Sequence, residues 1–184
     1  MQKLQKSQKT KKPKNQKKTK EVSGMRNMKE RDMVIISYLR KDARMNLTTM
    51  SRQTGIPVST IFDRIRLHEK DIIKKHTAII DFSRLGYTTR INMMLKSKKD
   101  EKESLKNYLA KQDNVNSVYK INNNYDFLVE GIFLNIKEFE DFLDRMDSKF
   151  SIEAKEIYYI VDEIKREDFM SDPQNVSMLP DTRT

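Results

Sequence analysis

The chain lacks cysteine and has few of the residues that specialised chemical sites require. Of its 184 residues, none is cysteine, two are histidine and four are glycine. Without thiolates, neither a disulfide framework nor a zinc finger can form, and the sequence predicts no metal site and no cofactor. Four scattered glycines build no phosphate-binding loop, and neither His68 nor His76 is paired with an evident nucleophile. We therefore expect a protein that is not an enzyme.

Long apolar runs are also missing. No stretch approaches the roughly 20 apolar residues of a membrane span, and the lysine-rich start holds no signal-peptide run. The chain is 36% hydrophobic and 35% charged, which is polar but allows part of it to fold. Its length suits one ordinary domain or two small ones. These features predict a soluble, cytoplasmic protein.

Positive charge is concentrated in the first part of the chain, whose net charge is +10 in total. Residues 1–25 hold nine lysines and one glutamate, and residues 26–80 hold twelve basic and six acidic residues. Residues 81–184 hold sixteen basic and twenty acidic residues. This division indicates that the N-terminal part meets a polyanion, with nucleic acid as the leading partner. A lysine-rich tail that only keeps the protein soluble is the alternative.

Three helices are predicted in the N-terminal part. Apolar residues at helical spacing over residues 28–41 indicate an amphipathic helix. Asn46 is a good N-cap for a second helix that ends before Gly55, which favours a left-handed conformation. A third helix follows Pro57 and runs to about Lys70. Two short helices across a glycine-containing turn are typical of a helix-turn-helix.

The third helix has the polar face that a DNA-reading helix needs. Ile61 and Ile65 lie about 40° apart around it and define its buried side, with Phe62 and His68 on the flanks. Arginine can bond guanine bidentately, hydroxyl groups can reach bases or phosphates, and aspartate can accept from cytosine. A solvated face on a three-helix domain that binds protein is the alternative. The predicted DNA contacts are Thr48, Ser59, Thr60, Asp63, Arg64, Arg66, Lys74 and Lys75.

The remaining sequence alternates between strand and helix patterns in the order βαββαβ, which predicts a ferredoxin-like fold. Consecutive asparagines at residues 122–124 accept left-handed conformations and favour a turn between the second and third strands. The predicted strands are 88–98, 115–121, 126–133 and 152–161, and the predicted helices are 101–111 and 135–150.

The whole chain is therefore expected to have an α+β fold in four segments. They are a disordered lysine-rich tail (1–25), a helix-turn-helix domain of the winged type (26–81), a ferredoxin-like effector and oligomerisation domain (82–170) and a flexible C-terminal tail (171–184).

Several predicted strands are apolar on both faces. In residues 127–133, Phe127 and Val129 alternate with Leu128 and Ile132. The helices can cover only one face of a four-stranded sheet, so the other must be buried elsewhere. A second copy of the chain is the simplest cover, which predicts a homodimer or higher oligomer. Burial under the N-terminal domain or the C-terminal tail is the alternative.

A series of motifs in a fixed order resembles the Lrp/AsnC family of regulators, in its archaeal type, over roughly residues 28–170. The resemblance implies a DNA-binding helix-turn-helix, a C-terminal domain that pairs through its sheets, and an amino acid or related effector bound between subunits. Between Ile65 and Ile72 the chain is one residue shorter than the family pattern, and Ile72 replaces a customary glycine. The matching motifs are Asp32, Asp42-Ala43-Arg44, residues 55–65, residues 72–81 and Leu85-Gly86-Tyr87.

The resemblance also implies an effector-binding turn between the second and third strands. Asn123, Asn124, Tyr125 and Asp126 occupy it, and Asn123 replaces the family's glycine. Asparagine can adopt the left-handed conformation that glycine would supply. A purely structural turn is the alternative.

The sequence thus predicts a sequence-specific DNA-binding transcription regulator, modulated by an amino acid or related small molecule. Two alternatives stay open. One is an architectural DNA-binding protein with little sequence preference, because phosphate neutralisation by lysines is independent of sequence. The other is a small-molecule-binding protein whose N-terminal domain no longer binds DNA.

Overall fold

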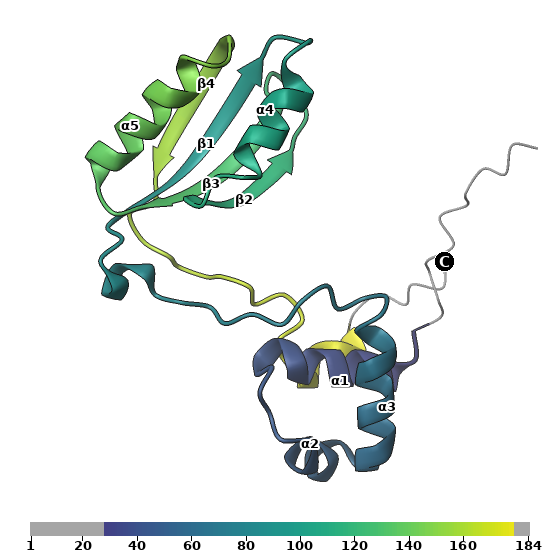
Figure 1. The fold of residues 1–184 in the computed structure, drawn as a ribbon. Coiled ribbons are helices and arrows are strands. Elements are labelled where there is room, and N and C mark those ends of the chain that lie inside the picture. Colours follow the sequence, from purple (N-terminus) through teal and green to yellow (C-terminus); the bar gives the residue numbers. More distant parts are fainter. Residues whose placement is uncertain (1–27, 179–184) are drawn as a thin grey trace, which may run out of the picture. The chain divides into compact units, whose positions relative to one another are not determined.

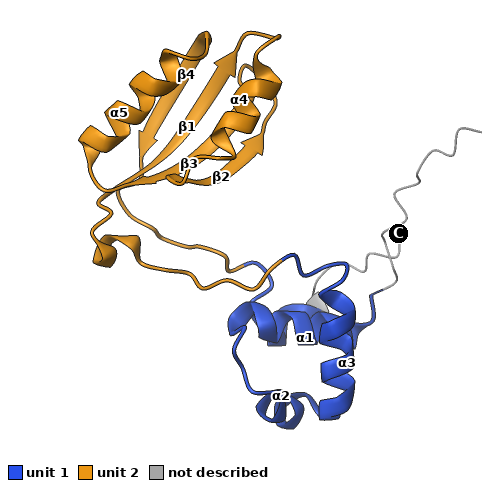
Figure 2. Cartoon of the chain, viewed as in Figure 1, with its two compact units in different colours: residues 1–74, 169–184 blue, residues 75–168 orange. Residues whose placement is uncertain are grey.

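The computed structural model describes residues 28–178, which form two compact units. Unit 1 contains the described residues up to Lys74 and those from Phe169 onward, and unit 2 contains Lys75–Asp168 (Figure 2). The predicted boundary at residue 81 thus falls inside unit 2. The predicted lysine-rich tail lies outside the described residues.

Unit 1 is built from three α-helices and one short 3-10 helix. Its core consists of apolar side chains from each α-helix and from the turn before α3, namely Ile35, Met50, Ile56 and Ile61. The elements are α1 (Glu30–Lys41), α2 (Leu47–Thr54), α3 (Val58–His68) and η2 (Pro173–Met178).

The predicted ends of α2 are confirmed in atomic detail. The Asn46 side chain accepts a hydrogen bond of 2.8 Å from the Thr48 amide, which satisfies one of the free N–H groups of the first turn. Gly55 follows the helix with φ +70°, a left-handed conformation that favours glycine. Pro57 then precedes α3, where its missing N–H costs nothing. These local signals produce the helix-turn-helix that the sequence predicts.

One side chain of α3 differs from expectation. Phe62 was predicted on the flank of the buried side, but its side chain is 49% exposed. It lies about 60° from Ile65 around the helix, and the unit 1 core does not extend that far. Leu67 is also exposed, at 40%. His68, in contrast, is buried as predicted, and α3 ends there rather than at Lys70.

The C-terminal segment was predicted as a flexible tail from residue 171. In the structure, η2 packs on α1 and Val176 is buried. The Arg40 side chain also donates a 3.0 Å hydrogen bond to the Phe169 carbonyl oxygen. The packing of η2 on α1 could not be predicted from the sequence. A six-residue 3-10 helix is too short for a repeating pattern of apolar residues that would mark Val176 as buried.

Unit 2 is ferredoxin-like, as predicted, and the chain as a whole is α+β. Its four strands form an antiparallel sheet in the order β2-β3-β1-β4, with both α-helices on one face (Figure 1). The elements are η1 (Phe82–Leu85), β1 (Thr89–Ser97), α4 (Lys102–Leu109), β2 (Val115–Lys120), β3 (Phe127–Phe133), α5 (Ile136–Asp147) and β4 (Ile152–Tyr159).

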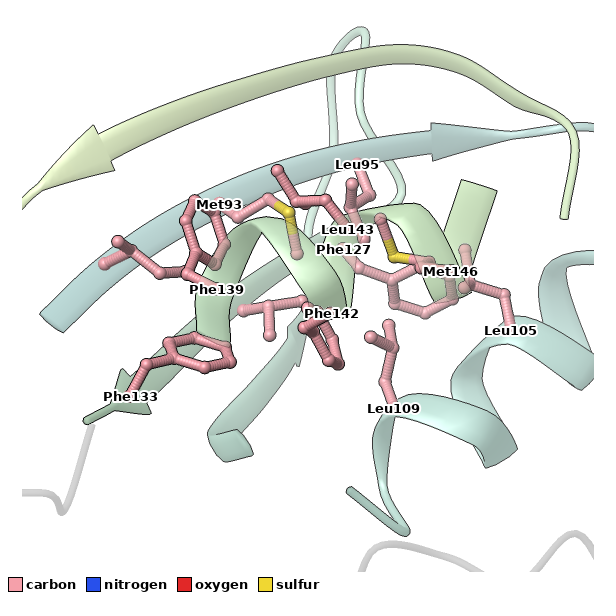
Figure 3. Packing of buried hydrophobic residues seen from close by; sticks show 12 residues of the cluster. Met93, Leu95, Leu105, Leu109, Phe127, Phe133, Phe139, Phe142, Leu143 and Met146 are labelled. Carbon is pink, nitrogen blue, oxygen red and sulfur yellow. The ribbon is translucent and has the colours of Figure 1, made fainter. Parts of the chain in front are cut away.

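The core of unit 2 lies between the sheet and its two helices (Figure 3). Ile91, Met93 and Leu95 of β1 are fully buried on the same face, as their alternation predicts. Ile136 is 58% exposed, because it is the first residue of α5 and lies at the edge of the core. The helix side chains that complete the core are Leu105, Leu109, Phe139, Phe142, Leu143 and Met146.

Candidate nucleic-acid interface

The outer face of α3 gathers most of the predicted base-reading residues. With 100° per residue, Ser59, Asp63 and Arg66 fall within about 60° of one another, and all three are exposed. Thr60 is exposed at the start of the same helix. One helix side therefore presents a hydroxyl, a carboxylate and a guanidinium, which together can donate to and accept from base edges.

Arg66 on this face contacts an aromatic ring. Its Cζ atom lies 5.7 Å from the centroid of the Phe62 ring, one helical turn earlier. This distance is within the range of a cation–π interaction. The ring thus favours one arrangement of the long arginine side chain at the protein surface.

Arg64 is directed elsewhere. Its Nε atom lies 3.3 Å from Oδ1 of Asp32 in α1, and its side chain is 31% exposed. The sequence grouped Arg64 with the base-reading residues, although it lies at the edge of that face. The carboxylate of Asp32 attracts it toward α1.

The same carboxylate faces a buried histidine. Nε2 of His68 lies 3.4 Å from Oδ1 of Asp32, and both side chains are less than 10% exposed. Neither of these two atoms makes a hydrogen bond with good geometry, so the ion pair with Arg64 is the contact that compensates the buried Asp32 carboxylate. Sequence reasoning missed this cluster, but a carboxylate three residues before Ile35 on an apolar helix face was a usable signal.

The remaining predicted DNA contacts lie outside α3. Thr48 is exposed in the first turn of α2. Lys74 and Lys75 are exposed in the extended segment that follows α3. The boundary between the two units falls between these lysines, so only Thr48 and Lys74 share a unit with α3.

The predicted effector turn connects β2 with β3. Asn123 has φ +67°, which confirms its left-handed conformation, and Asn124 is exposed. The Tyr125 hydroxyl donates to the Glu156 carboxylate of β4. Hydrogen bonds from Tyr125 and Tyr158 lower the pKa of Glu156 below its usual value.

Asp126 at the end of this turn is engaged within the fold. Its carboxylate accepts from the Ser97 amide at 3.1 Å and pairs with Lys102 of α4. Burial alone would raise the pKa of Asp126, but the bonds from Lys102 and Ser97 outweigh it, so the pKa lies below its usual value. These contacts hold the turn against β1 and α4, which gives Asp126 a structural role.

A second ionic cluster lies on the sheet face opposite the helices. Arg90 of β1 donates to Glu130 of β3 at 3.0 Å and also pairs with Glu163. Asn116 of β2 donates to the other oxygen of Glu130. This cluster was not predicted from the sequence, although Glu130 is the one charged residue in the apolar strand FLVEGIF.

The described residues contain neither a membrane-spanning helix nor a cluster of metal ligands. Within residues 28–178, no helix is long and apolar enough to cross a membrane. The same residues contain no group of three or more His, Asp or Glu side chains arranged to hold a metal ion.

A helix-turn-helix unit with a polar outer helix, joined to a ferredoxin-like unit, defines the class as a two-domain helix-turn-helix protein. Comparison with known proteins then identifies the family. Residues 90–169 match the model of the Lrp/AsnC ligand binding domain. The HTH-type transcriptional regulator FL11 of Pyrococcus horikoshii is 36% identical over 128 residues, which cover 69% of this chain and 85% of that protein. The chain belongs to the Lrp/AsnC family.

Other relatives agree with this assignment. FL11 of Pyrococcus abyssi is 33% identical over 70% of this chain and 85% of its own length. AsnC of E. coli shares the fold at a TM-score of 0.66 and 18% identity, covering 73% of this chain and 93% of AsnC. A Neisseria meningitidis transcriptional regulator in complex with L-Met shares the fold at a TM-score of 0.69 and 19% identity. The match covers 73% of this chain and 90% of that protein. FL11 and the Neisseria meningitidis protein are transcription regulators, in agreement with the sequence-based prediction that this chain is not an enzyme.

Proposed function

We propose that this chain is a sequence-specific DNA-binding transcription regulator whose helix α3 enters the major groove. The observation that carries the proposal is the outer face of α3, where Ser59, Asp63 and Arg66 are exposed together on a capped two-helix frame. An α-helix fits the major groove, and arginine bonds guanine there in a bidentate manner. Thr48 and Lys74 would contact phosphates and fix the register of α3.

Selection of bound sequences from a random duplex library tests this function. We expect an enriched motif that binds at least about a thousandfold more tightly than random DNA at physiological salt. Equal binding to all sequences would contradict sequence-specific regulation and favour the architectural alternative. The absence of DNA binding would leave only the small-molecule-binding alternative.

We further propose that the protein acts as a homo-oligomer through the sheet face that α4 and α5 leave open. That face carries Tyr119 and Tyr158, which are 56% and 51% exposed, beside the half-buried Met94 and Leu128. Exposed apolar surface of this kind favours pairing with a second copy. Sedimentation of a fragment from Tyr87 to Lys165 should give a dimer or larger species at micromolar concentration. A monomer would contradict paired sheets.

An amino acid or related small molecule is the effector that we propose, because the matched family model is a ligand binding domain. The exposed Asn123 and Asn124 side chains, with the neighbouring Tyr125, offer amide and hydroxyl groups to such a ligand. Thermal unfolding with each amino acid in turn should reveal a stabilising one, since a ligand bound only to the folded state raises the unfolding temperature. Asn124→Ala should reduce that shift. If none of the amino acids raises the unfolding temperature, the proposed effector is wrong.

A further inference from the structure

The Phe62 side chain stands out on the outer face of α3. It is 49% exposed and is not among the residues that form or support the unit 1 core. It lies about 40° from Arg66 and about 60° from Ser59 around the helix, among the polar residues proposed to face DNA. An aromatic ring at this position contributes little to folding and exposes apolar surface to water.

The ring and Arg66 form one chemical unit. Because the guanidinium carbon lies 5.7 Å from the ring centroid, an apolar surface and a forked hydrogen-bond donor are presented side by side. The ring also restricts the arginine, so less side-chain entropy is lost when the arginine binds a base.

The major groove contains a matching pair of features. Thymine is the base that offers a methyl group there, and apolar side chains such as phenylalanine contact it. Guanine offers two acceptors to an arginine. Base pairs are stacked about 3.4 Å apart, so side-chain groups 5.7 Å apart can reach bases one or two steps from each other.

We propose that Phe62 is a specificity-determining residue that contacts the 5-methyl group of a thymine, one or two base pairs from the guanine that Arg66 reads. This inference rests on the proposed function, since it requires α3 in the major groove. It assigns the exposed ring to DNA rather than to a protein partner.

Replacement of thymine by uracil tests the contact, because it removes the methyl group and leaves base pairing intact. In the selected motif, each thymine is replaced in turn and the affinity of the full-length protein is measured. We expect a thymine whose replacement weakens binding about fourfold, which corresponds to about 0.8 kcal/mol for one buried methyl group. In Phe62→Ala, the same replacement should have no effect.

Leu67→Ala is the matched control. Leu67 is an apolar residue of the same helix, 40% exposed, but lies about 140° from Phe62. This variant should keep the sensitivity to uracil. Equal sensitivity in wild type and Phe62→Ala would overturn the proposal.

The wild-type scan decides the matter even where Phe62→Ala folds poorly. If a motif is enriched but no thymine is sensitive to loss of its methyl group, Phe62 has no such contact, while the proposed function stands. If no motif is enriched, the proposed function itself fails.

Discussion

At the scale of single residues, the two arginines of α3 have different contacts because they lie on different sides of the helix. Arg66 lies on the outer face against Phe62, whereas Arg64 is two residues earlier and pairs with the buried Asp32 of α1. A buried carboxylate needs a compensating charge. We infer that Arg64 positions α3 against α1 and that Arg66 is available to a base.

Substitution of each arginine by alanine should separate these two roles. Arg66→Ala should weaken binding to the selected motif by about 1 to 3 kcal/mol and relax the preference at one base pair. Its thermal unfolding should match that of the wild type. Arg64→Ala should instead lower the free energy of unfolding by about 1 kcal/mol, because Asp32 loses a partner that is itself partly exposed. Altered preference at one base pair in Arg64→Ala, without loss of stability, would reverse the assignment.

Glu130 should make the stability of unit 2 depend on pH. Burial would raise the pKa of Glu130, but hydrogen bonds from Asn116 and Arg90 outweigh burial and hold the pKa below the usual 4.5. The ionised carboxylate therefore stabilises the fold above that value, and the stabilisation is lost as the pH falls through the lowered pKa.

Chemical denaturation of Glu130→Gln measures this contribution. We expect the wild type to be more stable than the variant at pH 7 and the difference to shrink as the pH falls below 4.5 and through the lowered pKa of Glu130. Glu140→Gln on the exposed side of α5 serves as a control for the loss of one negative charge. A wild-type advantage that grows as the pH falls would contradict the argument.

Individual helices in each unit begin with an asparagine cap. Asn46 accepts from the Thr48 amide in unit 1, and Asn135 accepts from the Glu138 amide at 3.0 Å in unit 2. Both bonds replace water at amide groups that have no partner within the helix. The two caps are alike in chemistry and belong to different units, so each is a control for the other.

Alanine at either cap should destabilise its own helix by about 1 kcal/mol. Hydrogen exchange followed by mass spectrometry should show faster exchange in α2 for Asn46→Ala and in α5 for Asn135→Ala. Each substitution should leave the other helix as in the wild type. Faster exchange throughout the chain in either variant would show that the two units do not unfold independently.

The short element η2 joins the end of the described chain to the DNA-binding unit. Val176 is buried where η2 packs on α1. Val176→Ala removes two carbon atoms from this contact and should reduce the stability of unit 1 by about 1.5 kcal/mol. Exchange of the α1 amides measures the effect, with Val161→Ala as a control because that side chain is 97% exposed. Unchanged exchange in Val176→Ala would show that η2 contributes nothing to unit 1.

At the scale of the whole molecule, positive charge is concentrated at the lysine-rich N-terminus. We expect these lysines to raise the affinity for DNA of any sequence to a similar extent. Each phosphate contact contributes roughly 0.9 to the slope of log affinity against log salt concentration. Deletion of residues 1–24, with nine lysines, should lower specific and non-specific affinity by similar factors and flatten that slope.

A chain with those nine lysines replaced by glutamine provides the control for length. It should behave like the deletion, because the expected effect depends on charge. Titrations on the selected motif and on random DNA at several salt concentrations make the comparison. An unchanged slope in both variants would favour a role of the lysines in solubility alone.

What the sequence determined by itself was mostly local. The cap at Asn46, the left-handed Gly55 and the left-handed Asn123 follow from backbone preferences that depend on a residue and its close neighbours. The order of strands and helices was equally predictable, because buried faces repeat every two residues in a strand and about every 3.6 in a helix. These periods are sufficient to predict the ferredoxin-like fold.

Tertiary structure decided which side chains meet. The pairing of Arg64 with Asp32 and that of Arg90 with Glu130 join residues 32 and 40 positions apart, and no local pattern records such distances. The exposure of Phe62 and the burial of Val176 depend on where a core ends and on which distant segment covers it. Burial and charge pairing depend on surfaces that folding brings together. For that reason only the tertiary structure could show that Arg64 pairs with α1 whereas Arg66 lies on the outer face of α3.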